Sequence, residues 1–223
     1  MNIDGKAWRT IWLELDGRSV GVIDQTQLPH RFTTQTLLTC TEAADAIRTM
    51  VVRGAPLIGV TGAYGLMLAL QADPSDGALA AAFAQLNATR PTAINLRWAL
   101  ERVRERVAPL PPAERAEAAK AEAAAIADED VAMCEAIGEH GLQLFQQLAA
   151  ARPPERQHEP LRVLTHCNAG WLPRSIGARP WPPFTRPTVP GSTSTCGSMR
   201  PARATRAPAS PPLSWAARGC RTR

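Results

Sequence analysis

After a long region rich in alanine and glutamate, the chain reads Arg162-Val163-Leu164-Thr165-His166-Cys167-Asn168-Ala169-Gly170-Trp171-Leu172. The apolar residues within 161–165 predict a strand, and the small and polar residues after it predict a loop at its carboxyl end. In open α/β sheets, ligands bind at this end of the strands. A cysteine there can act as a nucleophile or transfer protons if its thiolate is stabilised. Cys167 is therefore a candidate catalytic residue, although a lone cysteine at a strand end is more often a small buried apolar side chain.

The composition of the chain changes after Leu172. The last 51 residues contain nine Arg and ten Pro, but no Asp, no Glu and no Lys. Since the whole chain has 25 basic and 20 acidic residues, its first 172 residues carry 16 basic and 20 acidic ones, a net charge of −4. The net charge of +5 for the whole chain is thus a property of its tail, and it does not indicate an acidic partner for the body.

The sequence indicates neither a membrane anchor nor a disulfide framework. Residues 1–6 lack the apolar core of a signal peptide, and the most apolar run, 55–70, is short for a bilayer span. The five cysteines are widely spaced, odd in number and without a CxxC pair, which argues against disulfides and against a zinc site. We therefore expect a cytoplasmic protein.

Two local patterns open the body of the chain. Short apolar runs on either side of Asp16-Gly17 predict a β-hairpin, because Asp-Gly favours a tight turn between two strands. After a polar stretch that ends at Leu28-Pro29-His30, apolar residues at helical spacing predict a helix over about 41–51.

A second helix is predicted to begin at Pro56, where the missing N–H of proline costs nothing. Arg53-Gly54 precedes it, so free backbone N–H groups, the helix dipole and a cation meet at one place. These are the elements of an anion site. Taken alone, the same residues more often form a buried helix with a solvated Arg53.

The segment Arg90-Pro91-Thr92 repeats the pattern before a third helix, for which Thr92 can serve as the cap. The basic residues of that helix, Arg97, Arg102, Arg104 and Arg106, are interpreted as a solvated face that needs no partner. After Pro111-Pro112, an Ala/Glu-rich pattern predicts a long helix to about residue 150, with Gly138 and Gly141 as points of bending, and then a polar connector over 155–160.

Five segments together resemble the methylthioribose-1-phosphate isomerases of methionine salvage. The resemblance covers residues 8–172 in order. The same superfamily holds regulatory subunits of the translation-initiation-factor-2B type and ribose-1,5-bisphosphate isomerases, but the joint presence of Arg-Gly-Ala and Arg-Pro-Thr favours the methylthioribose enzymes. The segments are Ile23-Asp24-Gln25-Thr26-Gln27-Leu28-Pro29, Val52-Arg53-Gly54-Ala55-Pro56-Leu57-Ile58-Gly59, Arg90-Pro91-Thr92-Ala93-Ile94-Asn95-Leu96, Ile137-Gly138-Glu139-His140-Gly141 and Thr165-His166-Cys167-Asn168-Ala169-Gly170.

The resemblance implies an α/β fold with two parts. Residues 1–155 would form an N-terminal β-hairpin plus helical domain, and residues 156–172 the first strand of a truncated Rossmann-like catalytic domain. It also implies an aldose–ketose isomerase that converts 5-methylthioribose 1-phosphate into 5-methylthioribulose 1-phosphate without a metal or another cofactor. Whether hydrogen moves as a proton or as a hydride stays open.

The resemblance further assigns roles to particular residues. Arg53, Gly54 and Ala55 would bind the substrate, Arg90 would help to clamp it, and Cys167 matches the catalytic cysteine. The small-molecule sugar phosphate is the expected partner, with no nucleic acid and no membrane. A homodimer is expected for the intact parent, whereas the oligomeric state of this chain stays open.

The tail lacks the Asp, the Gln and the Asn-Lys pair that complete the family's site downstream. Regrouping the codons of residues 175–180 one base earlier permits Val-Asp-Trp-Gly-Thr-Ala, which continues the family pattern, and residues 198–212 permit a second family segment. A change of reading frame near residue 172 therefore explains the tail better than a basic arm for nucleic acid does. We expect residues 173–223 to be disordered, the strand before them to lack parallel neighbours, and this chain to be inactive as an isomerase. The alternative functions are a non-catalytic regulatory subunit or a ribose-1,5-bisphosphate isomerase.

Overall fold

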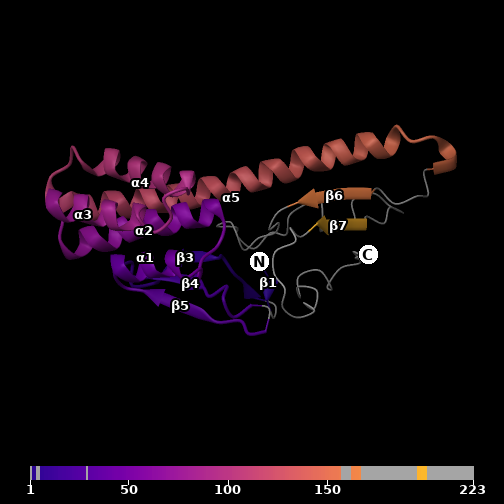
Figure 1. The fold of residues 1–223 in the computed structure, drawn as a ribbon. Coiled ribbons are helices and arrows are strands. Elements are labelled where there is room, and N and C mark those ends of the chain that lie inside the picture. Colours follow the sequence, from indigo (N-terminus) through magenta and orange to yellow (C-terminus); the bar gives the residue numbers. More distant parts are fainter. Residues whose placement is uncertain (1, 4–5, 29, 157–161, 167–194, 200–223) are drawn as a thin grey trace. The chain divides into compact units, whose positions relative to one another are not determined.

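The computed structural model describes residues 2–3, 6–28, 30–156, 162–166 and 195–199 (Figure 1). The chain divides into two compact units, and the division falls inside the long helix, between Ala132 and Met133.

A small antiparallel sheet begins the first unit. Strands β3 (Ile11–Leu13), β4 (Val20–Ile23) and β5 (Thr34–Leu37) lie in that order, with Ile11 opposite Val22 and Val20 opposite Leu37. The predicted hairpin is confirmed, and Gly17 has the positive φ of 66° that its turn requires. Strand β5 was not predicted, because Thr34, Gln35 and Thr36 are polar and exposed. Ahead of the sheet, β1 (Asn2–Ile3) and β2 (Lys6–Ala7) form a separate antiparallel pair.

Helices pack around α2 (Ala55–Ala72), which contacts α1 (Cys40–Arg48), α3 (Asp76–Asn87) and α4 (Ile94–Val107). By length and composition α2 could cross a membrane, but 72% of it is buried within the protein, as is typical of a core helix. The first part of α5 (Pro112–Ala150) adds Ala119, Ala123 and Ile126 to the same hydrophobic core. Figure 1 shows this helical layer lying against one side of the sheet.

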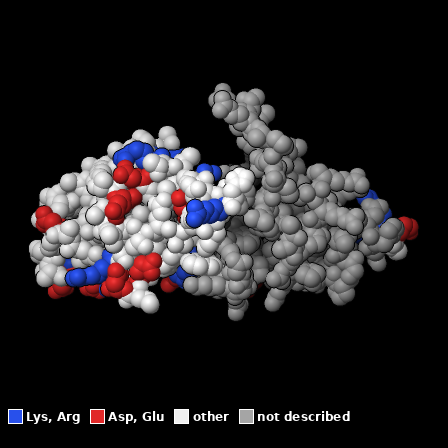
Figure 2. Space-filling view, turned by 90° about the horizontal axis from the view of Figure 1, so that it is seen from below, with Lys and Arg blue, Asp and Glu red and all other residues white. Residues whose placement is uncertain are grey.

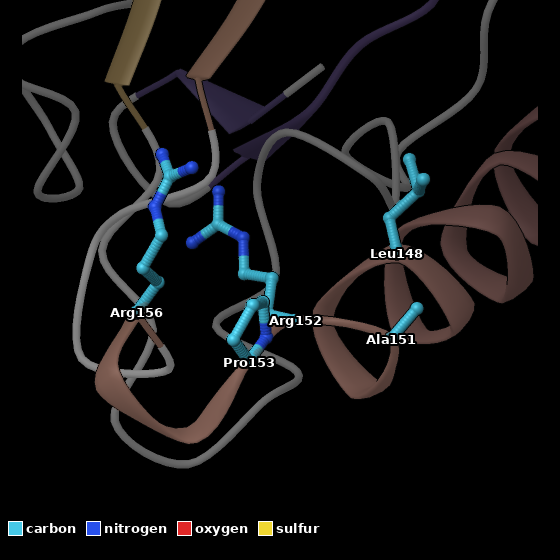
Figure 3. Close-up of a pocket in the computed structure, with 5 residues that line it drawn as sticks. All are labelled: Leu148, Ala151, Arg152, Pro153 and Arg156. Carbon is cyan, nitrogen blue, oxygen red and sulfur yellow. The ribbon is translucent and has the colours of Figure 1, made fainter.

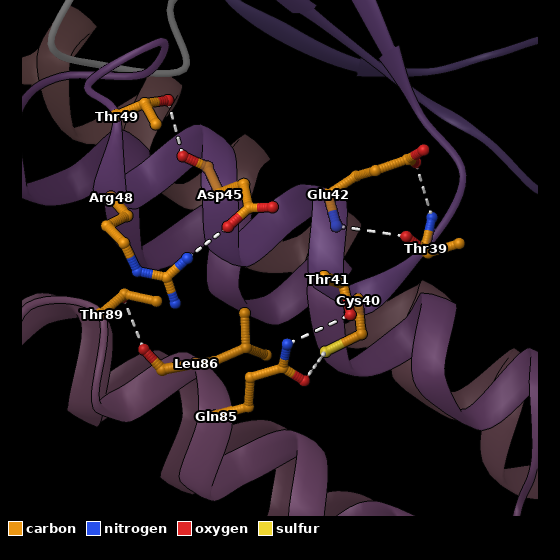
Figure 4. A network of polar contacts seen from close by, with 10 residues as sticks. All are labelled: Thr39, Cys40, Thr41, Glu42, Asp45, Arg48, Thr49, Gln85, Leu86 and Thr89. Atoms are coloured by element: carbon orange, nitrogen blue, oxygen red, sulfur yellow. Dashed lines mark hydrogen bonds and ion pairs between the residues drawn. The ribbon is translucent and has the colours of Figure 1, made fainter.

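Two helices of this layer begin at side-chain caps. Thr39 accepts a hydrogen bond from the Glu42 backbone N–H, and the Glu42 carboxylate accepts from the Thr39 N–H, which completes a capping box at α1 (Figure 4). Ser75 accepts from the Ala78 N–H at the start of α3. Helix α3 was not predicted, although Ser75 followed by Asp76 is a start signal that the sequence offers.

The predicted cap of α4 is wrong. Ala93, not Thr92, occupies the N-cap position, and no side chain caps the helix. The physical reason is a turn: the Ala93 N–H donates to the Arg90 carbonyl at 2.9 Å, so the chain enters the helix one residue later than expected. Leu96, Leu100, Val103 and Val107 are all buried and form the apolar stripe of this helix.

The interpretation of Arg102 as solvated and unpartnered is also wrong. Its Nε donates to Glu122 at 2.6 Å and its Nη2 to Glu129 at 2.7 Å, both on α5. Its guanidinium also lies 5.4 Å from the Trp98 ring centroid. The hydrogen bond from Arg102 lowers the pKa of Glu129. Acidic residues on the facing helix, too far away in sequence to be anticipated, supply these partners.

Cys40 at the start of α1 is a free, half-buried thiol. Its Sγ lies 3.9 Å from Gln85 Oε1 in the polar network of Figure 4, and burial raises the pKa of the Cys40 thiol to about 11. From an ordinary value near 9, the thiolate fraction at pH 8 falls about a hundredfold. We expect Cys40 in the folded chain to react with iodoacetamide about a hundredfold more slowly than in urea, measured by peptide mass spectrometry. Equal rates in the two states would contradict this.

The same raised pKa has a pH consequence for stability. The folded state favours the neutral thiol. The thiol therefore contributes its full share of the folding stability below about pH 9, its pKa in the unfolded chain, and this share is lost as pH rises through about 11, its pKa in the folded chain. Urea unfolding should therefore show stability falling across that window, and a Cys40→Ala variant should show a shallower fall.

The second unit begins with the remainder of α5, which continues through Gly138 and Gly141 without interruption. The 3-10 turn η1 (Pro154–Arg156) and strand β6 (Arg162–His166) follow, so the predicted strand is confirmed. Residues 195–199 form strand β7 (Thr195–Met199), parallel to β6, with Arg162 opposite Thr195 and His166 opposite Met199. The expectation that β6 lacks a parallel neighbour is therefore wrong. The unpaired N–H and C=O groups along a strand edge favour pairing, and residues 195–199 include no proline or charge to prevent it. The rest of the tail, predicted to be disordered, lies outside the described residues.

Candidate anion-binding site

The turn that contains Arg53 is shaped by the end of α1. Met50 has a φ of 64°, and the Val52 N–H donates to the Ala46 carbonyl at 3.2 Å, as in a Schellman-like helix end. Gly54 then takes the N-cap position of α2 with φ 100° and ψ 138°. Only glycine adopts this conformation without strain, so the Arg53-Gly54 pair directs the chain into α2.

The start of α2 leaves backbone donors available. Gly54 has no side chain to cap the helix and Pro56 has no N–H, while the first helical bond runs from the Ile58 N–H to the Gly54 carbonyl at 2.9 Å. The N–H groups of Ala55 and Leu57 therefore have no acceptor within the helix, and they lie at the positive end of its dipole. Arg53 is exposed beside them, with its Nε donating to the Met50 carbonyl at 3.3 Å. This arrangement favours an anion.

The start of α4 is built in the same way. It has no side-chain cap, and the half-buried Arg90 stands three residues before its N-cap, Ala93. The two helix starts are neighbours: a Cβ placed on Gly59 would lie 2.8 Å from the Asn95 carbonyl oxygen. Gly59 is about 6 Å along the helix from Ala55, and Asn95 is the second residue of α4. Two uncapped helix starts, each preceded by an arginine, therefore share one end of the bundle.

The predicted site residues divide into two groups. Arg53, Gly54 and Ala55 form the start of α2, and Arg90 lies ahead of α4, so the structure brings these two segments to the same end of the first unit. Cys167 lies outside the described residues, and its position relative to the arginines stays a prediction. Their roles in binding likewise stay predictions.

Two residues of this region received no role from the sequence. The Gln25 N–H donates to the Val51 carbonyl at 2.9 Å and so joins the end of the sheet to the turn that carries Arg53. The carbonyl of Asn95 meets Gly59 where the helices cross. The small residues at 59 and 62 are a sequence signal for close helix packing, but nothing local identifies α4 as the partner.

The described residues form two shallow hollows elsewhere. One, of about 490 Å³, lies between β5 and α1 and is lined by Gln35, Leu37, Glu42 and Asp45 among others. The other, of about 400 Å³, lies in the second unit, where Arg152 and Arg156 extend toward the same side (Figure 3). Neither is lined by Arg53 or Arg90.

The two helix starts are the part of the described residues whose chemistry suits an anion. No group of three or more His, Cys, Asp and Glu side chains in the described ranges could hold a metal ion. On the face drawn in Figure 2, basic and acidic side chains of the described residues are mixed and form no extended field of one sign. Recognition of an anion there would come from Arg53, Arg90 and the helix starts.

Comparison with known proteins defines the class. The model of the Initiation factor 2 subunit family matches residues 51–181, and the chain belongs to this family. Within it, the chain is 58% identical over 172 residues to the methylthioribose-1-phosphate isomerase of Rhodospirillum centenum, covering 77% of this chain and 45% of that enzyme. It is also 54% identical over 182 residues to an uncharacterized protein in the petC 3' region of Rhodospirillum rubrum, covering 81% of this chain and 99% of that protein.

Solved structures agree with this assignment. The chain resembles 5-methylthioribose 1-phosphate isomerase from Pyrococcus horikoshii with a TM-score of 0.62 and 35% identity, over 75% of this chain and 46% of that one. It resembles the delta subunit of translation initiation factor eIF-2B from A. fulgidus with a TM-score of 0.64 and 29% identity, over 85% of this chain and 54% of that one. The predicted family and α/β fold are confirmed. The chain spans about half the length of the isomerases that it matches.

Proposed function

We propose that residues 1–172 supply the substrate-binding half of a sugar-phosphate isomerase that converts 5-methylthioribose 1-phosphate into 5-methylthioribulose 1-phosphate in methionine salvage. The 58% identity to an isomerase of that name carries the proposal. The paired helix starts with Arg53 and Arg90 support it, because they suit a phosphate dianion. The setting is cytoplasmic, without metal, cofactor, nucleic acid or membrane, and the intact parent is a homodimer.

The substrate carries phosphate on C1, so its ring cannot open through a free anomeric hydroxyl. The site must hold the phosphate firmly while hydrogen moves between C2 and C1. Arg53 and Arg90 donate charge-assisted hydrogen bonds to the phosphate oxygens, and the Arg53-Gly54-Ala55 turn presents the free N–H groups at the start of α2, including that of Ala55, to the same phosphate. Cys167 takes part in the hydrogen transfer. This chain is inactive because the downstream Asp that completes the acid–base pair is missing after residue 172.

Isomerase assays test the catalytic part of the proposal. The 223-residue chain is expected to give no turnover. A version with the reading frame restored near codon 172 is expected to be active, and Cys167→Ala in that version should lower kcat about a thousandfold. Turnover by the 223-residue chain would contradict its inactivity, and an inactive restored version would contradict the isomerase itself.

Phosphate binding tests the arginines separately. Arg53→Ala is expected to weaken the binding of inorganic phosphate to the 223-residue chain about tenfold or more, because a charge-assisted bond is lost. Arg106→Ala is the control, since Arg106 is exposed in the last turn of α4, at the opposite end of that helix from its start. Isothermal titration calorimetry supplies both constants. Equal weakening by the two substitutions would show a general charge effect and refute the assigned site.

A non-catalytic regulatory subunit is the second candidate, favoured by the similarity to the eIF-2B delta subunit over 85% of this chain. The regulatory reading predicts that the frame-restored version has no isomerase activity and that Cys167→Ala has no effect on its function. The third candidate, isomerisation of ribose 1,5-bisphosphate, predicts that the restored version turns over ribose 1,5-bisphosphate in the same assay.

A further inference from the structure

A buried carboxylate holds the turn that follows β4. Asp24 is only 6% exposed, and its Oδ1 accepts from the Thr26 N–H at 2.8 Å and from the Thr26 hydroxyl at 2.6 Å. Its Oδ2 accepts from Gln35 Nε2 on β5 at 3.0 Å. Burying a carboxylate is costly unless such bonds satisfy it, and here they fasten residues 24–27 to the neighbouring strand.

The same turn reaches the candidate anion site through one backbone bond. The Gln25 N–H donates to the Val51 carbonyl at 2.9 Å, two residues before Arg53. On its other side, the Val52 N–H bonds the Ala46 carbonyl at the end of α1. Residues 51–53 belong to no helix or strand, so these two bonds, together with the burial of Val51 and Val52, hold them in place.

We propose that Asp24 is a positioning residue for the anion site: it fixes the Asp24–Gln27 turn so that the bond from Gln25 to Val51 sets the place of Arg53 and Gly54. This rests on the proposed function. A binding group must be held within about 0.5 Å of its productive place, and an irregular segment achieves this only through bonds to rigid neighbours. The carboxylate itself does not touch the ligand.

Asp16, an exposed aspartate at the opposite end of β4, provides the control. It accepts from the Arg18 N–H at 2.7 Å, the Ser19 N–H at 2.9 Å and the Ser19 hydroxyl at 2.7 Å. Both aspartates therefore fasten a turn through backbone and hydroxyl donors, but the Asp16 turn has no bond to residues 50–54. Loss of the Asp16 bonds disturbs the hairpin without disturbing the site.

The experiment compares Asp24→Asn with Asp16→Asn in the 223-residue chain, with global stability measured by urea unfolding. Amide hydrogen exchange at Val52 and Arg53 should become about tenfold faster in Asp24→Asn, and inorganic phosphate should bind about fivefold more weakly by NMR titration. Both quantities should stay within about twofold of wild type in Asp16→Asn.

Unchanged exchange at Val52 and Arg53 in Asp24→Asn, or equal changes in both variants, would overturn the proposal. If Asp24→Asn does not fold, Thr26→Val removes the hydroxyl that donates to Asp24 Oδ1 and accepts from Gln27 Nε2, and it should give the same pattern at smaller amplitude; no local change there would also overturn the proposal. A wild-type chain that binds no phosphate would remove the proposed function, whereas the exchange rates would still decide whether Asp24 holds the turn.

Discussion

Gly59→Ala is expected to lower the free energy of unfolding by about 2 kcal/mol, because the steric cost of the added methyl group exceeds the gain in helix propensity from alanine. The added Cβ would lie 2.8 Å from the Asn95 carbonyl oxygen and 3.2 Å from its carbon. Backbone atoms cannot rotate away as a side chain can, so α4 itself must shift relative to α2. Since this crossing also sets the two helix starts beside each other, the same variant should bind inorganic phosphate more weakly.

Gly77→Ala is the matched control, because it makes the same chemical change within a helix. Only Ser75 Oγ, at 3.9 Å, would approach the new Cβ of Gly77. The gain in helix propensity should therefore appear alone, as a stabilisation of about 0.5–1 kcal/mol. Urea unfolding of both variants measures the difference. If Gly59→Ala were also stabilising, the close approach of α2 and α4 would be wrong.

Arg115→Met is expected to cost about 3 kcal/mol, a large effect for one substitution outside the apolar core. The Arg115 side chain is 7% exposed. It donates from Nε to the Leu110 carbonyl at 3.0 Å and from Nη1 to the Pro74 carbonyl at 3.0 Å. A third, longer bond runs from Nη2 to the Ala108 carbonyl at 3.4 Å. Methionine keeps most of the volume but none of the donors, so all three carbonyl groups would lose their charged partner. The loops before α3 and α5 would then separate.

The ion pair of Arg115 with Asp76 makes a smaller contribution. The two charges are 2.7 Å apart, but Asp76 is 87% exposed, and water screens such a pair. Asp76→Asn should therefore change the free energy of unfolding by less than about 0.5 kcal/mol. Thermal or urea unfolding distinguishes the two substitutions. A larger loss for Asp76→Asn than for Arg115→Met would show that the ion pair, not the carbonyl contacts, holds the loops.

Local signals predicted the elements that form from neighbouring residues. The Asp16-Gly17 turn predicted the hairpin, and Pro56 after Arg53-Gly54 predicted the start of α2 within one residue. Strand β5 was not predicted because Thr34-Gln35-Thr36 has no apolar pattern. The segment is a strand because it pairs with β4. Thr92 was a good cap in isolation, but the turn closed by Arg90 and Ala93 placed the helix start beyond it.

Part of the candidate site was predictable for the same reason. The Arg53-Gly54-Ala55 segment carries its own chemistry: a cation, a glycine at a positive φ of 100° and a helix start without a cap. The resemblance of the chain to the isomerases added Arg90 to the candidate site. The support of the site by Asp24 and Gln25 was not predictable, because it depends on a hydrogen bond from residue 25 to residue 51.

Sequence alone therefore determined the hairpin, the helices other than α3, the family and the residues expected to bind phosphate, since turns, periodicity and motifs depend on residues close together in the chain. The tertiary structure decided which of those residues meet. The approach of Gly59 to Asn95 places the starts of α2 and α4 together, and it arises from the packing of two helices whose contacting residues are far apart in sequence. Neither segment encodes that approach by itself, because close packing depends on the shapes of both surfaces at once.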